Sequence, residues 1–130
     1  MAKEKISQIV EFNTSASKIY EILTKEDLFG SLSGAPTKID AKEGGSFSLF
    51  GGMITGKNLT LLLGKKIVQD WRVKLWPEGT SSIVTFELTE KSGITTLTME
   101  HVGFPADAKQ GLADGWDKNY WEPIKNKIAK

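Results

Sequence analysis

The stretch KKIVQDWRVKLW, from Lys65 to Trp76, alternates apolar and polar residues and decides the fold class. On one side of an extended chain lie the apolar residues Ile67, Trp71, Val73 and Leu75, and on the other lie Asp70, Arg72 and Lys74. An alternation with a period of two predicts a strand with one covered face and one face in water. This strand therefore needs a second layer that covers its apolar face.

Other stretches with the same alternation extend this strand into a sheet. They are KISQIVEFN (5–13), SIVTFELTE (82–90) and ITTLTMEHV (94–102). Turn residues separate the strands at 44–45, 51–52, 64–65, 77–79 and 92–93. Short apolar runs between such turns predict an antiparallel meander.

The covering layer is predicted near the carboxyl end of the chain. There, a helical face is formed by residues four apart, namely Leu112, Trp116, Tyr120, Ile124 and Ile128. Pro123 lies inside this helix and predicts a kink or local break, because proline cannot donate a backbone hydrogen bond. A shorter helix is expected over 16–23 after the N-cap pair Thr14-Ser15, followed by an irregular connection over 24–36 with one helical turn near 25–29.

These elements predict an α+β protein in which residues 1–130 form a single domain. The chain carries 17 basic and 16 acidic residues, and Arg72 is its one arginine, which argues against a nucleic-acid partner. It contains no cysteine and no run of transmembrane or signal-peptide type, so no membrane association is expected and the cytoplasm is the expected location. The initial Met1 favours a complete chain.

The glycine-rich stretch KEGGSFSLFGGMITG, from Lys42 to Gly56, raises the question of a phosphate-binding loop. Such loops bind anions because a helix begins directly after the glycines. Here, the glycines are followed by strand-like alternation, with Phe47 and Leu49 opposite Ser46 and Ser48. Hairpin turns are the better interpretation of this stretch.

Catalytic and metal-binding motifs are not found in the sequence. His101 is the only histidine, and no histidine spacing typical of a metal site is present. It is expected on the apolar face of its strand, where a hydrogen-bonded core residue or the polar anchor of a pocket is favoured over a catalytic base. We therefore expect no catalytic residue, no metal, no cofactor and no enzyme.

Taken together, several stretches resemble the family of the C-terminal domain of the activator of heat-shock protein 90 ATPase, within the START-like (SRPBCC) helix-grip superfamily. They are GGSFSLFGGMITG (44–56), KKIVQDWRVKLWPEG (65–79), SIVTFEL (82–88), TTLTMEHVGFP (95–105) and GWDKNYWEPIK (115–125). The resemblance spans Lys5 to Ile128. It implies a curved antiparallel sheet of six or seven strands wrapped around a long C-terminal helix.

For function, the resemblance implies two classes. The first is a co-chaperone module that binds heat-shock protein 90 and stimulates its ATPase activity through a surface near Arg72 and Trp76. In eukaryotic members, a separate preceding domain contributes much of the stimulation, and its motifs are not found in this sequence.

The second class is a binder of a small hydrophobic ligand in a cavity between the sheet and the C-terminal helix. Its lining would be Phe47, Phe50, Met53, Trp71, Met99, His101, Trp116 and Tyr120. The same aromatic residues are also suited to ordinary core packing, and the sequence leaves these alternatives open. An enzyme of the superfamily's cyclase or hydrolase type is a distant third.

Overall fold

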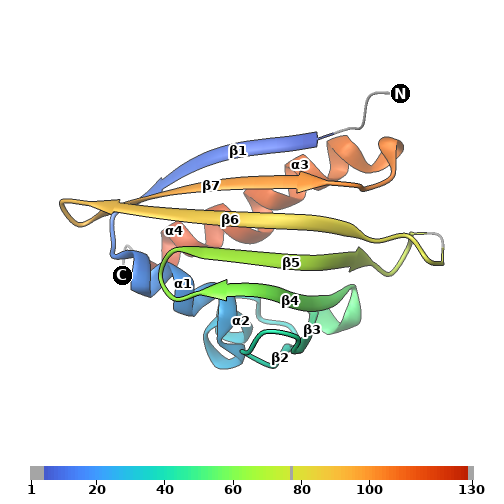
Figure 1. Cartoon of the computed structure of the whole chain (residues 1–130), viewed down its shortest axis with the longest axis horizontal. Helices are drawn as coiled ribbons and strands as arrows, with labels where there is room; N and C mark the ends of the chain where they lie inside the picture. The colour runs from blue at the N-terminus through green and yellow to red at the C-terminus, as the bar shows by residue number, and fades with distance from the viewer. Residues whose placement is uncertain (1–4, 77, 129–130) are drawn as a thin grey trace.

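One curved, seven-stranded antiparallel sheet forms the framework of the computed structural model, which describes residues 5–76 and 78–128. The strand order is β1-β7-β6-β5-β4-β3-β2, so the strands after β1 form a continuous meander and β1 joins β7 at the far edge. Figure 1 shows the C-terminal helix crossing one face of the sheet, with two short helices near one end of it. The α+β, single-sheet prediction is confirmed.

The strands are β1 (Lys5–Phe12), β2 (Lys38–Ile39), β3 (Ser46–Leu49), β4 (Ile54–Leu62), β5 (Lys66–Val73), β6 (Ser82–Lys91) and β7 (Ile94–Val102). The helices are α1 (Ala16–Thr24), α2 (Glu26–Ser33), α3 (Lys109–Trp116), the π-helical turn η3 (Asp117–Trp121) and α4 (Glu122–Ile128). Two 3₁₀ turns, η1 (Phe50–Gly52) and η2 (Ala106–Ala108), complete the order. No described helix is both long and apolar enough to span a membrane.

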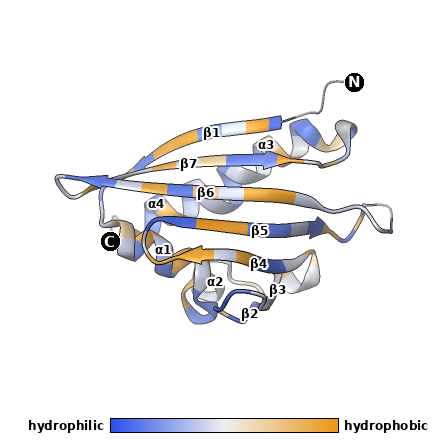
Figure 2. Ribbon diagram, viewed as in Figure 1, coloured by the Kyte–Doolittle hydropathy of each residue, from blue (hydrophilic) through white to orange (hydrophobic). Residues whose placement is uncertain are grey.

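The period-two pattern in the sequence matches the burial in the sheet. Val84 pairs with His101, Phe86 with Met99 and Leu88 with Leu97 across β6 and β7, and all six side chains are buried. Figure 2 shows the resulting alternation of hydrophobic and hydrophilic residues along the long strands. The apolar halves of the strands therefore face the helices, as the alternation predicts.

One residue of the opening stretch departs from its predicted position. Leu75 was expected on the apolar face of the strand, but β5 ends at Val73 and Leu75 is 80% exposed. The cause is a tight turn in which the Trp76 amide donates to the Val73 carbonyl. That turn ends the alternation before Leu75 and points Trp76 back toward the core, where it is buried.

Helix α1 begins where the sequence predicts it. The Ser15 Oγ accepts a hydrogen bond from the Lys18 amide, and the Glu90 carboxylate of β6 accepts one from the Ala16 amide. These two bonds satisfy amides that a helix start leaves unpaired, and the second one ties α1 to the sheet.

Helix α2 is longer than expected. A single turn near 25–29 was predicted within an irregular segment, but the helix continues to Ser33 and ends at Gly34 in the left-handed conformation. Burial of Phe29 against Phe50 and Tyr120 stabilises it, although Gly30 lowers its intrinsic helix propensity. Tertiary packing therefore overrides the local signal here.

The C-terminal helix is continuous from α3 through η3 to α4, and its irregularity lies where Pro123 predicts one. The Glu122 amide donates to the Asp117 carbonyl, five residues back, which defines a π-helical turn directly before the proline. A wider turn accommodates a residue that cannot donate to the carbonyl four positions earlier. The helix thus passes the proline without interruption.

The glycine-rich stretch forms turns and strands, as predicted, with the short 3₁₀ turn η1 between β3 and β4, and no α-helix begins in it. Gly56 has a specific role in it, because β4 passes very close to β5 at this position. A Cβ atom at Gly56 would overlap the Asp70 carbonyl oxygen and lie 2.8 Å from Phe47 Cζ. Only glycine permits this approach of the two strands.

We expect Gly56→Ala to lower the free energy of unfolding by about 3 kcal/mol, because the strands must separate to admit the methyl group. The measurement is urea unfolding followed by tryptophan fluorescence. Gly30→Ala serves as a control, since its Cβ would be 3.5 Å from Thr37 and the substitution favours the helix. An unchanged midpoint for Gly56→Ala would contradict the close approach of β4 and β5.

Candidate functional site

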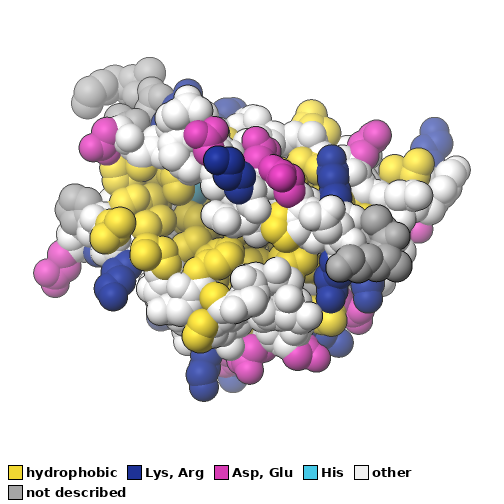
Figure 3. Space-filling view, turned by 180° about the vertical axis from the view of Figure 1, so that it is seen from behind, with side chains coloured by type: hydrophobic (Ala, Val, Ile, Leu, Met, Phe, Trp, Pro, Cys, Tyr) yellow, Lys and Arg dark blue, Asp and Glu magenta, His cyan; other side chains and the backbone are white. Residues whose placement is uncertain are grey.

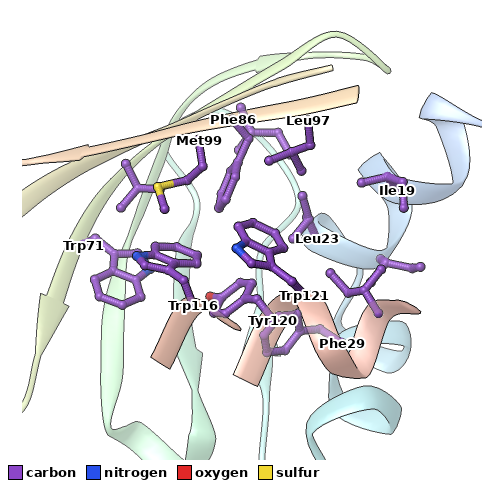
Figure 4. Packing of buried hydrophobic residues seen from close by; sticks show 14 of the residues in the cluster. Ile19, Leu23, Phe29, Trp71, Phe86, Leu97, Met99, Trp116, Tyr120 and Trp121 are labelled. Carbon is purple, nitrogen blue, oxygen red and sulfur yellow. The ribbon is translucent and has the colours of Figure 1, made fainter. Parts of the chain in front are cut away.

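The centre of the core is formed by aromatic side chains of the C-terminal helix. Trp116 stacks between Trp71 of β5 and Trp121, with ring centroids 5.3 Å and 5.6 Å away and interplanar angles of 23° and 16°. The ring centroids of Tyr120 and Trp116 are 4.4 Å apart, and the Phe86 ring of β6 packs edge to face against the Trp116 ring. Figure 4 shows the residues of the helix and of the sheet pointing toward one another in this cluster.

A chain of hydrogen bonds passes through the fully buried His101 and links the helix to the three strands β7, β6 and β5. The Trp116 Nε1–H donates to His101 Nδ1 at 3.2 Å, and His101 Nε2 lies 2.7 Å from Ser82 Oγ. Because an indole nitrogen only donates, Nδ1 is an acceptor and Nε2 carries the proton. The Ser82 hydroxyl then donates to the Trp71 carbonyl at 2.9 Å.

This environment holds His101 in its neutral form. Burial lowers the pKa of His101 to about 4, since desolvation disfavours the imidazolium. Both ring nitrogens are already engaged, so the side chain is not positioned to accept a proton from a substrate. The structure therefore places His101 as a hydrogen-bonded core residue, one of the two roles favoured from the sequence.

Between β4, β5 and the helix α3 lies a pocket of about 130 Å³, called here the helix–sheet pocket. Its lining comprises Phe50, Met53, Ile54, Trp71, Val73, Gly111, Leu112, Gly115, Trp116, Asn119 and Tyr120. Figure 3, viewed from the helix side, shows hydrophobic side chains gathered in a hollow at the centre of this face. Gly111 and Gly115 of α3 contribute only backbone to this lining, and Met53 on the opposite wall is 40% exposed.

The structure brings together five of the eight residues expected to line a cavity, namely Phe50, Met53, Trp71, Trp116 and Tyr120. The other three, Phe47, Met99 and His101, are buried in the core and do not line the helix–sheet pocket. Phe47 lies over Gly56 instead, and Met99 of β7 lies opposite Phe86 of β6. Five of the predicted residues therefore border a pocket, and the other three belong to the packed core.

Two polar groups lie in the wall of the pocket. The Trp71 indole N–H is buried and forms no hydrogen bond of regular geometry with a described residue. Burial raises the pKa of Tyr120, and a side-chain hydrogen bond with Trp71 opposes this shift, so the Tyr120 hydroxyl lies beside the Trp71 indole. The Trp71 donor and the Tyr120 hydroxyl are therefore neighbours in the pocket wall without the distance and angle of a regular hydrogen bond.

Backbone strain accompanies the pocket at Phe50. This residue adopts a left-handed conformation with φ of 54°, although it is not a glycine. Such a conformation costs about 1 kcal/mol. Its ring packs against Phe29 and Tyr120 and so forms part of the pocket wall.

Arg72 and Trp76, the predicted partner-binding residues, shape the turn after β5. The Arg72 guanidinium donates to the Thr80 carbonyl at 2.7 Å and to the Trp76 carbonyl at 2.8 Å. Trp76 is buried, with its ring 6.4 Å from Trp71. These contacts fix the turn and leave Leu75 as its exposed apolar side chain.

Several residues of the site were not identified from the sequence. Ser82 links His101 to β5, and Gln8 accepts a hydrogen bond from Trp121 Nε1 at 2.6 Å. Both have polar side chains on the inward face of their strands, and that position was the available signal. Among the described residues, no group of three or more histidine, aspartate or glutamate side chains could hold a metal ion.

A curved antiparallel sheet that grips a long C-terminal helix, with two small helices after the first strand, defines a START-like helix-grip fold. The family described as activator of Hsp90 ATPase homolog 1-like protein matches residues 13–128. The chain belongs to this family, as the resemblance in the sequence predicted.

Two similar proteins illustrate the relatives of this chain. The chain is 36% identical over 121 residues to the human activator of 90 kDa heat shock protein ATPase homolog 1, covering 93% of this chain and 36% of that protein. It is 32% identical to the Dictyostelium discoideum homologue, covering 92% of this chain and 31% of that protein. The chain thus spans about a third of the length of the curated relatives that it matches.

Solved structures share the fold over the whole chain. An HSP90 activator from Plasmodium falciparum has a TM-score of 0.92 with 27% identity, and 96% of each chain is covered. CalU16 from Micromonospora echinospora has a TM-score of 0.79 with 19% identity, covering 94% of this chain and 74% of that one. The second similarity concerns the fold alone.

The lowered pKa of His101 predicts a loss of stability in acid. The unfolded chain binds a proton near pH 6.5 and the folded chain only near pH 4, so this stabilisation is complete above pH 6.5 and is lost as the pH falls toward 4. Between pH 7 and pH 5 the loss is about 2 kcal/mol.

Urea unfolding at both pH values measures this loss, and His101→Gln provides the control. Because the chain has a single histidine, the difference in pH dependence between the native protein and the variant isolates its contribution. Identical pH dependence in the two proteins would show that His101 is not held neutral by the fold.

Proposed function

We propose that this chain binds a chaperone of the Hsp90 type and stimulates its ATPase activity, and that it acts in the cytoplasm. The observation that carries the proposal is the similarity to the human Hsp90 ATPase activator, which extends over 93% of this chain. The similarity to the Plasmodium HSP90 activator, with nearly equal chain lengths, supports it further.

An activating rather than an enzymatic role accounts for the chemistry of the site. The only histidine is neutral and hydrogen-bonded at both ring nitrogens, so it is not available as a general base. The chain would instead act by binding the chaperone conformation that hydrolyses ATP more strongly than the others, and so raise its population.

The turn after β5 is the surface that we propose for the chaperone. The Arg72 guanidinium holds this turn through two carbonyl groups, and Leu75 projects from it with 80% exposure. A rigid turn loses little conformational entropy when it binds, so an apolar contact on it contributes efficiently to affinity. Arg72 and Trp76 would thus support the surface rather than form most of it.

The direct test combines a steady-state ATPase assay with isothermal titration calorimetry, using the Hsp90-type chaperone from the same organism. Saturating amounts of this chain should raise the ATPase rate, and calorimetry should detect binding. Neither binding nor stimulation at saturating concentration would disprove the proposed function.

A pair of leucine variants tests the proposed surface. Leu75→Ser should weaken chaperone binding about tenfold by removing the apolar contact, without affecting the fold of an exposed turn. Leu63→Ser is the matched control, because Leu63 is also 80% exposed but lies in the turn at the other end of β5. Equal affinities for the two variants would place the contact elsewhere.

A further inference from the structure

Strand β1 is the outermost strand at one edge of the sheet, and no described strand pairs with its outer side (Figure 1). Natural edge strands often block pairing with other chains through bulges, prolines, short length or charged side chains. β1 pairs with β7 over eight positions without a bulge, and it contains no proline. Its charges, Lys5 and Glu11, lie toward its ends, and Ile9 near its centre is 72% exposed. The opposite edge strand, β2, has only two residues.

The register of the sheet identifies the backbone groups of β1 that face outward. The Leu88 amide donates to the Lys65 carbonyl, so the even-numbered residues of β6 direct their backbone groups to β5. In an antiparallel sheet, these groups alternate from side to side along each strand. The odd-numbered residues of β7 therefore bond to the even-numbered residues of β1. The backbone N–H and C=O groups of Ser7, Ile9 and Glu11 consequently point away from the sheet.

A groove lies between this edge and the C-terminal helix. Its lining comprises Ile9, Val10, Glu11, Asp117, Trp121, Glu122 and Lys125. Three of these residues are acidic and one is basic, and all four charged residues are exposed. A strand added to β1 would place alternate side chains toward the groove and toward the outer face of the sheet. Basic side chains on the groove side would meet an excess of negative charge, and apolar ones on the other side would lie beside Ile9.

We propose that β1 binds an extended, basic segment of a partner protein as an additional antiparallel strand. Hydrogen bonds to the backbone of Ser7, Ile9 and Glu11 contribute most of the affinity, and Asp117 and Glu122 favour lysine or arginine on the groove side. Exposed ion pairs are weak individually, so the charges select the sequence rather than hold it. This edge is separate from the turn after β5, and the proposal does not depend on the chaperone interaction.

The experiment uses a short capped peptide in which lysine alternates with valine, titrated into the full chain and followed by NMR. The amide protons of Ser7, Ile9 and Glu11 should become protected from exchange with solvent when the peptide binds. The same peptide with glutamate in place of lysine should bind about tenfold more weakly, because it meets like charges in the groove. No binding of the lysine peptide, or equal affinities for the two peptides, would overturn the proposal.

Backbone methylation of the peptide tests the strand pairing itself. Residues directly opposite each other share a face of the sheet, so valines beside Ile9 direct their amides to β1 and the lysines direct theirs to solvent. Methylating the valine nitrogens should therefore reduce affinity at least about tenfold, whereas methylating the lysine nitrogens should preserve binding. Equal effects of the two methylations would show that the peptide does not bind as a strand at this edge.

Two substitutions in the chain locate the peptide. Ile9→Pro removes only an outward N–H, which an edge strand tolerates, and it should abolish binding, whereas Ile9→Thr keeps that N–H and should retain binding. Glu122→Gln should weaken binding of the lysine peptide about threefold, and Glu87→Gln, on the outer face of β6, should leave it unchanged. Unchanged binding in both Ile9→Pro and Glu122→Gln would place the peptide elsewhere and overturn the proposal.

Sedimentation of the chain without peptide distinguishes a second possible occupant of the edge. If the chain forms a dimer that Ile9→Pro dissociates and the lysine peptide does not bind, a second copy of this chain covers β1, and the proposal of a basic partner segment is wrong. None of these measurements uses the chaperone, so failure of either proposal leaves the other intact.

Discussion

The contact between Trp116 and the sheet is the interaction on which the rest of the structure depends. Its ring stacks between two other indoles, and its N–H holds the one histidine in a defined tautomer. His101 in turn engages Ser82, which bonds to the backbone of β5. One side chain of the helix thereby sets the positions of three neighbouring strands, both by packing and by hydrogen bonding.

The alternation of the sequence was sufficient to predict the sheet, because burial of one face imposes a period of two on every long strand. It also located Trp71 and Trp116 on surfaces that face each other. Local pattern was insufficient at α2 and at Leu75. In α2, the burial of Phe29 outweighs an unfavourable glycine, and at Leu75 a backbone turn fixed by Arg72 interrupts the strand. Both outcomes depend on contacts between distant residues.

The same limit applies to the candidate site. Phe47 and Phe50 are three residues apart and equally suited to a cavity wall, but only Phe50 reaches the pocket. Phe50 has a positive φ, which turns its side chain toward the pocket. The Phe47 ring instead lies over Gly56, where β4 and β5 approach each other closely. Residue type identified the aromatic cluster, whereas backbone geometry decided which members border open space.

The core also combines well-satisfied and poorly satisfied polar groups. Both ring nitrogens of His101 are hydrogen-bonded, whereas the Trp71 indole N–H nearby forms no hydrogen bond of regular geometry with a described residue. Complete networks make a core rigid, and an unpaired donor is retained at a cost in stability. The His101 ring contacts the Trp71 and Trp116 rings, so this hydrogen-bonded network lies directly behind part of the pocket wall.

The π-helical turn at Asp117–Trp121 resolves a conflict of periods in the C-terminal helix. A regular α-helix repeats every 3.6 residues, so a stripe of residues four apart rotates by about 40° at each step. The wider turn removes part of this rotation, and Trp116, Tyr120 and Ile124 remain fully buried along one line. Pro123, which follows this turn, favours the wider turn because it cannot donate a regular helical hydrogen bond. The same side of the helix therefore faces the sheet from Trp116 to Ile124.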